Sequence, residues 1–215
     1  MDYFISDIHF GHREVIKFCE RPFRTVSEMN SAIIKNWNSI VDDTDRVFVV
    51  GDVFIGDYNS AKLCVESLNG HKVLIKGNHD LRKKEMLFMG FDEYHKKYDY
   101  VMPDGRLALL QHYPMPDIIL DKKYDMLIHG HIHIDNKVNG KKINVSADIW
   151  NYTPVDVETI KNLSLGKSSE ELLSVSISDD GTLSIECKIR MEDFSGAADY
   201  VYKEMSKKYP DRRKK

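Results

Sequence analysis

Cysteine is scarce in this chain and follows no recognisable pattern. The 215 residues include three cysteines, Cys19, Cys64 and Cys187, which are an odd number and lie far apart. This spacing fits neither a disulfide framework nor a cysteine-based zinc or redox motif. A chain of this length can bury most of its surface without cross-links. We therefore expect a cytoplasmic protein that folds without disulfides.

An excess of charge of one sign and long apolar runs are also absent. Lysine and arginine total 31, and aspartate and glutamate total 34, so the chain lacks the basic excess of a dedicated nucleic-acid-binding protein. No apolar run reaches the roughly 18 residues of a membrane-spanning helix. The opening residues lack the basic region and the apolar core of a signal peptide. The sequence thus predicts a globular protein that does not cross a membrane.

Short apolar segments that end in metal-ligand residue types are the main feature of the first 133 residues. Each segment has three to five residues, is rich in Val, Ile or Leu, and reads as a buried strand. The segments are 3–6, before Asp7 and His9; 46–50, before Asp52; 72–76, before Asn78 and His79; 107–111, before His112; and 126–128, before His129, His131 and His133. Because functional groups gather at the carboxyl ends of strands in α/β sheets, we expect these side chains to converge.

Helical patterns separate the first three of these segments. Thr25 to Glu28 forms a capping box before an apolar stripe at 29, 33, 37 and 40. Asn59 is expected to cap a second helix that ends at Gly70, and a third helix is expected over 81–89. Hairpins are expected around 103–105 and 139–140. The fold class predicted from these patterns is α/β, with two stacked mixed sheets and helices outside.

The residue types at the segment ends suit a metal centre. Carboxylate, amide and imidazole ligands without a thiolate favour Mn²⁺, Fe or Zn²⁺. The candidate ligands are Asp7, His9, Asp52, Asn78, His112, His131 and His133. Seven ligands are too many for one such ion and suit two ions that share a bridging carboxylate, the arrangement that phosphoryl-transfer hydrolases use.

The ordered blocks resemble the calcineurin-like metallophosphoesterase superfamily over residues 1 to about 155. They are Asp7-x-His9, Gly51-Asp52, Gly77-Asn78-His79-Asp80, His112 and Gly130-His131-x-His133, and the opening block is similar to that of small bacterial and phage phosphoesterases. The resemblance implies a four-layer αββα sandwich with the metals at the strand ends. It places one metal on Asp7, His9, Asp52 and His133, and the second on Asp52, Asn78, His112 and His131, so that Asp52 bridges.

The resemblance also implies a reaction. His79 would face the substrate, stabilise the phosphate and protonate the leaving oxygen, while a hydroxide bridging the metals attacks phosphorus. His79 and Asp52 are therefore the expected catalytic residues. Mn²⁺ is the expected metal, with Fe, Zn²⁺ or Ni²⁺ as alternatives. Protein phosphatases of this superfamily carry Gly-Asp-x-x-Asp-Arg-Gly at the second block, whereas this chain has Ile55 at the second Asp and no Arg, which argues against that activity.

Several neighbouring residues carry weaker expectations. They are His12, Arg13 and Asn78 as phosphate-facing groups, Asp80 as an outer-shell group or a helix cap, His129 as an outer-shell or structural residue, and Asp148 as a turn residue. These assignments rest on position in the sequence alone.

The C-terminal part departs from the motif-bearing part. We expect a first domain over 1–161 and an appendage over 162–215, which begins with a linker at 163–169. The appendage should contain a hairpin of 172–178 and 182–189, a helix over 194–208 and a basic tail. It could cap the sandwich, shape the substrate site or make a dimer contact.

Three functions remain open from the sequence. The first is a dinuclear phosphoesterase acting on a small phosphomonoester or phosphodiester, with a nucleotide as the expected substrate. The second is a nuclease that uses the same metals and the basic tail. The third is a non-catalytic scaffold, which would usually have lost ligands.

Overall fold

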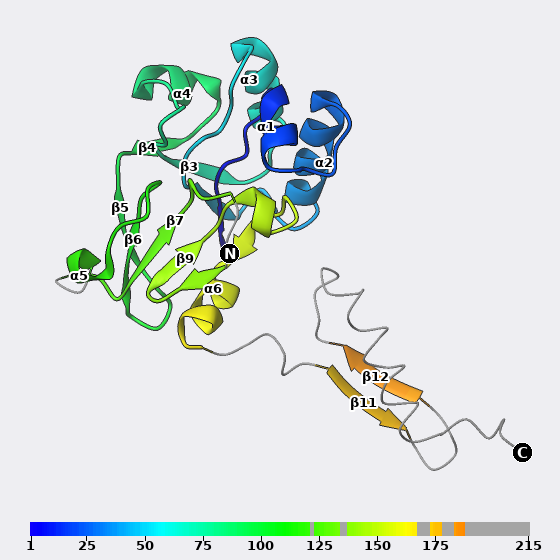
Figure 1. Ribbon diagram of the computed structural model, residues 1–215, viewed down its shortest axis with the longest axis vertical. Coiled ribbons are helices and arrows are strands. Elements are labelled where there is room, and N and C mark those ends of the chain that lie inside the picture. Colours follow the sequence, from blue (N-terminus) through cyan, green and yellow to red (C-terminus); the bar gives the residue numbers. More distant parts are fainter. Residues whose placement is uncertain (121–122, 134–136, 167–172, 178–182, 188–215) are drawn as a thin grey trace, which may run out of the picture. The chain divides into compact units, whose positions relative to one another are not determined.

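The computed structural model describes residues 1–120, 123–133 and 137–166, together with the backbone of 173–177 and 183–187. The chain divides into two compact units, residues 1–167 and 168–215. The first unit holds every candidate site residue, and its two sheets and surrounding helices are visible in Figure 1.

The first sheet carries three of the predicted strands. Its strand order is β10-β1-β2-β3-β4. The strands are β1 (Asp2–Ile5), β2 (Arg46–Val49), β3 (His71–Ile75), β4 (Glu93–His95) and β10 (Val155–Asp156). Strands β1 to β4 are parallel and β10 pairs with β1 antiparallel.

The second sheet carries the other two predicted strands and both predicted hairpins. Its order is β5-β6-β7-β9-β8. The strands are β5 (Tyr98–Val101), β6 (Leu107–Leu110), β7 (Met126–His129), β8 (Val138–Asn139) and β9 (Lys142–Asn144). It contains parallel and antiparallel pairs, so the prediction of two mixed sheets is confirmed.

Helices flank the sheets, and local sequence explains where two of them begin. The helical elements are α1 (Arg13–Phe18), α2 (Val26–Asn38), α3 (Tyr58–Glu66), α4 (Lys83–Met89), α5 (Asp117–Leu120), the 3₁₀ turn η1 (Ala147–Ile149) and α6 (Val157–Ser164). Thr25 caps α2 as predicted, since its hydroxyl accepts from the Glu28 amide at 3.1 Å. The prediction for α3 is wrong by two residues, because the Asp57 carboxylate rather than Asn59 accepts from the Ser60 amide at 2.8 Å.

The alternation of side chains along β1 shows how the layers pack. Ile5 lies with Met29 and Trp37 in the core between the first sheet and its helices. Phe4 points the other way and meets Tyr100 of the second sheet edge to face, with ring centroids 5.2 Å apart. On the far side of the second sheet, α5 packs through Leu120. Both sheets are therefore buried on the faces they share, with helices outside.

Backbone hydrogen bonds join the two sheets at the end of β1. The Ser6 amide donates to the Val145 carbonyl at 2.8 Å, and the Ala147 amide donates to the Ser6 carbonyl at 2.9 Å. The Asp7 amide donates to the Gly51 carbonyl at 3.0 Å. These bonds bring the ends of β1, β2 and β9 to one edge, where the candidate ligands follow.

The second unit contains the expected hairpin. Strands β11 (Leu173–Ile177) and β12 (Leu183–Cys187) are antiparallel, with Val175 opposite Ile185. The predicted helix over 194–208 and the basic tail lie outside the described residues. Helix α6 runs through the predicted boundary at 161, because Ile160 and Leu163 pack on the core of the first unit. Among the described residues, no helix has the length and apolar character needed to cross a bilayer.

Candidate metal centre

A first group of candidate ligands combines the end of β1 with the loop after β7. One ligand atom each from Asp7, His9 and His133 lies within 4.8 Å of the other two. The Nε2 atom of His133 is 3.3 Å from Nε2 of His9 and 3.6 Å from Oδ1 of Asp7. Asp7 and His9 are buried, which favours a site closed on its inner side.

A second group lies beside the first, and its residues follow the ends of β2, β6 and β7. Ligand atoms of Asp52, His112 and His131 are again within 4.8 Å of one another. Nε2 of His112 is 3.3 Å from Oδ2 of Asp52 and 3.0 Å from Oδ1 of Asn78. The amide oxygen of Asn78 therefore faces the same centre.

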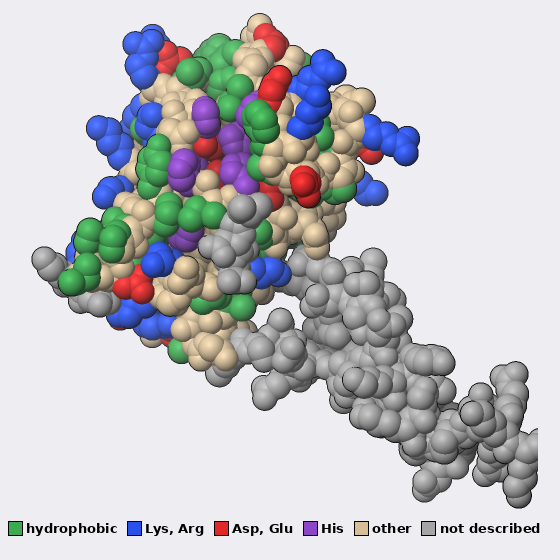
Figure 2. Space-filling model, viewed as in Figure 1, with side chains coloured by type: hydrophobic (Ala, Val, Ile, Leu, Met, Phe, Trp, Pro, Cys, Tyr) green, Lys and Arg blue, Asp and Glu red, His purple; other side chains and the backbone are tan. Residues whose placement is uncertain are grey.

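Asp52 lies between the two groups. Its Oδ2 atom is 3.3 Å from Nε2 of His112 in the second group and 4.0 Å from Nε2 of His9 in the first. A carboxylate in this position can face two cations at once, as a bridging ligand must. The seven sequence-predicted ligands thus converge, and Figure 2 shows histidine side chains gathered on one face with carboxylates between them.

Backbone strain is concentrated in the same place. Four candidate ligands have left-handed backbones, with φ of +55° at Asp7, +54° at His9, +56° at Asp52 and +71° at His131. Each such non-glycine residue costs on the order of 1–3 kcal/mol and persists only where its surroundings hold it. The strain turns successive strand ends sharply inward, toward one centre.

Two glycines allow this convergence. A Cβ at Gly77 would lie 2.2 Å from Oδ1 of Asp52, and one at Gly130 would lie 2.1 Å from Oγ of Ser6. No side chain fits at either position without moving the carboxylates beside it. The glycines of these two blocks are therefore required by close packing against the ligands.

The residues fit divalent cations on the evidence of an unsatisfied carboxylate. Among the residues that the structure describes, none hydrogen-bonds to the buried Oδ1 of Asp7. A buried polar atom without a partner costs about 1–3 kcal/mol. This atom points toward the Nε2 of His133, and a cation between them would satisfy both.

His79 and His12 border the centre. The His79 amide donates to Oδ1 of Asp52 at 3.0 Å, while its imidazole is 45% exposed with Nε2 3.8 Å from Oδ2 of Asp52. The His12 ring lies 5.2 Å from that of His9. Arg13 is exposed on α1. His79 thus lies beside the centre with its imidazole exposed, and its expected role toward a substrate stays a prediction.

Comparison with known proteins gives the family. Residues 3–135, more than half of the chain, match the family described as calcineurin-like phosphoesterase. The chain belongs to the calcineurin-like phosphoesterase family. This finding confirms the resemblance inferred from the sequence blocks.

Relatives of this chain match it over most of its length. It is 37% identical over 171 residues to the uncharacterized protein MJ1445 of Methanocaldococcus jannaschii, which covers 75% of this chain and 89% of the relative. It is 25% identical over 185 residues to the gene 66 protein of Mycobacterium phage L5, covering 69% and 86%. The crystal structure of AQ665 from Aquifex aeolicus, a protein of unknown function, matches at 28% identity with a TM-score of 0.63, covering 76% and 98%. None of these names states a substrate.

The electrostatics of the candidate metal centre favour metal binding by two of the candidate ligands. Burial lowers the pKa of His9 to about 3, and the neighbouring His133 and Arg21 add to this effect. Burial would raise the pKa of Asp52, but the hydrogen bond and charge of His112 outweigh it and lower the pKa to about 2. Near neutral pH the His9 imidazole is therefore uncharged and the Asp52 carboxylate ionised, the forms in which each could bind a metal.

Two other imidazoles hold protons more strongly. Burial lowers the pKa of His112, but hydrogen bonding to Asp52 and the charge of Asp7 outweigh this and raise it. The pKa of His133 is also raised, because Asp148 and Asp7 outweigh the effect of burial. A metal must displace these protons in order to bind.

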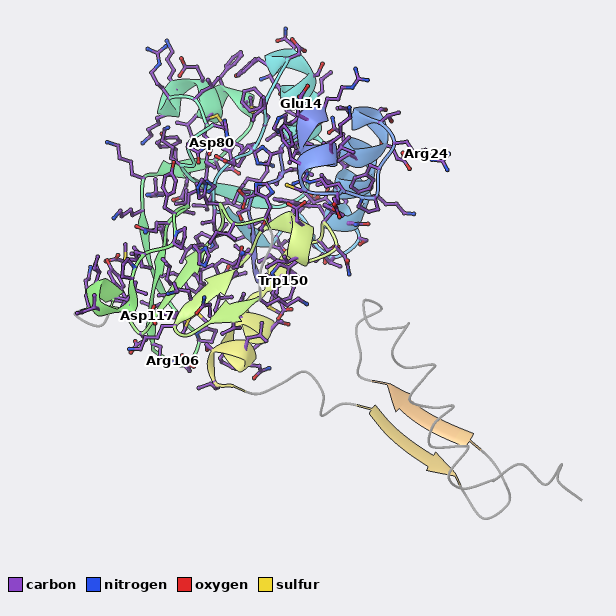
Figure 3. The ribbon with its side chains drawn as sticks, in the orientation of Figure 1. Glu14, Arg24, Asp80, Arg106, Asp117 and Trp150 are labelled. Atoms are coloured by element: carbon purple, nitrogen blue, oxygen red, sulfur yellow. The ribbon has the colours of Figure 1, made fainter. Side chains whose placement is uncertain are left out.

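Asp80 supports the centre through backbone amides. Its carboxylate accepts from the amides of Asp52 at 3.0 Å, Val53 at 2.9 Å and Gly77 at 2.7 Å. The expectation that Asp80 orients neighbouring ligands agrees with these contacts. The alternative, a cap on the following helix, is wrong, because α4 begins after Arg82, and Figure 3 shows Asp80 below that helix.

His129 is buried and is the last residue of β7, directly before Gly130, which packs closely against Ser6 and Asp7. One nitrogen of its ring, Nδ1, lies 2.8 Å from the carbonyl oxygen of Gly130. This position agrees with the structural or outer-shell role expected for it.

The interpretation of Asp148 as a turn residue is incomplete, because its side chain reaches the centre from η1. Its Oδ2 is 2.7 Å from Nδ1 of His133, and both of its oxygens accept from Arg21. The sequence analysis missed the contacts of Arg21 and Asp148 with the centre, since neither residue belongs to a motif block. The available clue was chemical: a metal-binding histidine usually donates its second ring N–H to a carboxylate or carbonyl.

Cys19 lies beside these residues but does not form a third metal site. One ligand atom each from Cys19, His133 and Asp148 falls within 4.8 Å of the others. The Arg21 guanidinium already occupies Asp148, and burial raises the pKa of the Cys19 thiol to about 11. A protonated thiol and a fixed cation both disfavour a metal there.

Proposed function

We propose that this calcineurin-like phosphoesterase hydrolyses a small phosphomonoester or phosphodiester at a dinuclear metal centre on the αββα sandwich. The observation that carries the proposal is the position of Asp52 between two groups of ligands that face one another. Asp7, His9 and His133 would hold one cation, and Asn78, His112 and His131 the other, with Asp52 shared. The seven-ligand set is intact, which disfavours a non-catalytic scaffold.

The chain's own residues divide the chemistry between them. Two bound cations, with Mn²⁺ the expected metal, would act as Lewis acids and lower the pKa of the attacking water. Asp52 accepts a hydrogen bond from the backbone amide of His79, and its own amide donates to Asp80, so its carboxylate would be held in place between the two cations. The exposed His79 imidazole would donate a proton to the departing oxygen, and His12, Arg13 and Asn78 would contact the phosphate.

An exposed aromatic ring beside the second group supports a nucleotide as substrate. The Tyr113 ring is 49% exposed, and its centroid lies 4.5 Å from that of His131 and 5.2 Å from that of His112. The side-chain amide of Gln111 donates to the Tyr113 carbonyl at 2.7 Å and fixes its backbone. A base that stacks on such a ring gains about 1–3 kcal/mol.

A substrate screen tests the proposal. The metal-free protein, reloaded with Mn²⁺, is assayed on phosphomonoesters, linear and cyclic nucleotides, dinucleoside polyphosphates and single-stranded DNA. Asp52→Asn should abolish turnover, whereas Asp57→Asn, at an exposed cap of α3, should retain it. Tyr113→Leu should raise KM for nucleoside esters but not for a simple alkyl phosphate.

Two results would count against the proposal. Turnover of single-stranded DNA alone would favour the nuclease alternative. A protein that binds two Mn²⁺ ions but turns over no ester would favour the scaffold.

A further inference from the structure

Arg21 is a fully buried arginine that contacts the ligand-bearing segment from outside. Its side chain is 0% exposed and forms a two-pronged ion pair with Asp148, with N···O distances of 2.7 and 2.8 Å. The same guanidinium donates to the carbonyl of Asp7 at 2.7 Å and to that of Ile8 at 3.0 Å. One cation therefore holds both a carboxylate and the backbone that carries a ligand.

The backbone contacts of Arg21 fall on a strained segment. Asp7 and His9 both have left-handed φ angles. Arg21 donates to the carbonyl of Asp7 and to that of Ile8, the residue between these two. Such strain persists only when the surroundings fix the backbone. Arg21 fixes this segment, and with it the direction of two ligand side chains.

The ion pair also sets the proton position on a third ligand. A carboxylate only accepts hydrogen bonds, so Nδ1 of His133, 2.7 Å from Oδ2 of Asp148, must carry the proton. In the neutral ring this leaves the lone pair on Nε2, the atom that faces Asp7 and His9. Asp148 thereby selects the tautomer that can bind a metal.

We propose that Arg21 and Asp148 are positioning residues for the first metal group, Asp7, His9 and His133, which they assemble before any metal binds. The proposal rests on the proposed function in that it takes this group to hold a metal. The second group depends on other contacts, since Nδ1 of His112 is 2.9 Å from the Val50 carbonyl. Loss of the Arg21–Asp148 pair should therefore weaken one metal and spare the other.

A second ion pair in the same sheet provides the matched control. Arg46 also binds Asp2 through two contacts, at 3.0 and 2.6 Å. This pair lies at the start of β1, whereas Asp7 follows the end of that strand. Asp2→Asn should lower the stability of the fold without changing metal affinity.

The test is Asp148→Asn, followed by Mn²⁺ titration of the metal-free protein. The Arg21 guanidinium should take the Asn oxygen, so that the Asn NH₂ faces Nδ1 of His133 and moves the ring proton to Nε2. We expect one Mn²⁺ equivalent to bind about 10- to 100-fold more weakly, while the other changes less than about twofold. Asp2→Asn should bind both equivalents as the parent protein does.

A second readout does not require metal or activity. Nitrogen-15 NMR of the histidine rings in the metal-free protein, at a pH high enough to leave the His133 ring neutral, should report His133 protonated on Nδ1, and on Nε2 in Asp148→Asn. If an unpaired Arg21 unfolds that variant, the double variant Arg21→Met, Asp148→Leu removes both charges together and leaves none buried alone. The double variant should also lose the affinity of one equivalent.

Clear results would overturn the proposal. The first is an unchanged Mn²⁺ affinity in Asp148→Asn and in the double variant. The second is a loss of Mn²⁺ affinity in Asp2→Asn equal to that in Asp148→Asn, which would show a general effect of stability. If the parent protein binds no Mn²⁺, the proposed function fails, but the NMR readout still decides the tautomer. An unchanged His133 tautomer in Asp148→Asn would then refute the positioning role on its own.

Discussion

Gly130→Ala adds a single methyl group and should weaken Mn²⁺ binding by the first metal group. The φ angle of Gly130 lies outside the left-handed region, so alanine carries no backbone penalty there. The added Cβ would stand 2.1 Å from Oγ of Ser6 and 2.4 Å from Oδ2 of Asp7, whereas real Cβ contacts essentially never fall below 3.0 Å. Ser6 donates to that same Asp7 oxygen at 2.6 Å, so the pair must move together.

The expected size of the effect follows from packing energetics. Inserting a methyl group into a filled interior typically costs about 1–3 kcal/mol. If the strain is relieved by displacing Asp7, this cost appears in metal binding, and 1.4 kcal/mol corresponds to about a tenfold change in affinity. We therefore expect the Mn²⁺ dissociation constant of one equivalent to rise about 5- to 140-fold.

Calorimetric titration of the metal-free protein with Mn²⁺ measures this effect. Gly105→Ala is the control, because its φ of +84° makes alanine cost about 1–2 kcal/mol of stability, while no described atom lies within 4 Å of the new Cβ. The control should lose thermal stability and bind both equivalents normally. Normal binding in Gly130→Ala would refute the account of close packing at Asp7.

Three further predictions concern the centre. Asp52→Asn should weaken both Mn²⁺ equivalents, whereas His9→Ala should weaken one and respond to excess metal; equal losses would contradict the shared carboxylate. The pKa values of His112 and His133 are raised, so protons on these rings stabilise the metal-free fold at low pH and compete with Mn²⁺. Titrations at several pH values should therefore show the Mn²⁺ affinity falling, as the pH is lowered, by up to about tenfold per pH unit for each protonated ring. A Mn²⁺ affinity independent of pH from 8 to 5 would contradict this. His79→Gln should keep both metals and lose about 10²–10⁴-fold in kcat on alkyl esters but less on nitrophenyl esters, and equal losses would indicate phosphate positioning instead.

The sheets and the ligand set were predictable because both depend on local pattern. Each predicted strand is a short run of buried apolar residues, and the ligands stand directly after the strands. In a sheet of parallel strands these positions share one edge, so sequence order alone predicts their convergence. The amide of His79, after β3, donates to Oδ1 of Asp52, after the neighbouring parallel strand β2, at 3.0 Å for this reason. Asp52 and His112 follow strands of different sheets, and they meet at 3.3 Å because the two sheets pack together.

The outer support of the centre was not predictable because it depends on tertiary contacts. Arg21 and Asp148 lie 127 residues apart, one after a short helix and the other in a 3₁₀ turn. Nothing local distinguishes a buried arginine from the exposed Arg13 or Arg24 on either side of it. The same holds for α3, where two polar residues, Asp57 and Asn59, both suit a cap and only the backbone decides between them.

Electron paramagnetic resonance of the Mn²⁺-loaded protein tests the central claim most directly, since it reports whether two metals share a ligand. With two Mn²⁺ equivalents bound, we predict the spectrum of a magnetically coupled pair, which Asp52→Asn should abolish. Saturation at one equivalent, with the six-line spectrum of an isolated ion, would contradict a dinuclear centre built on Asp52.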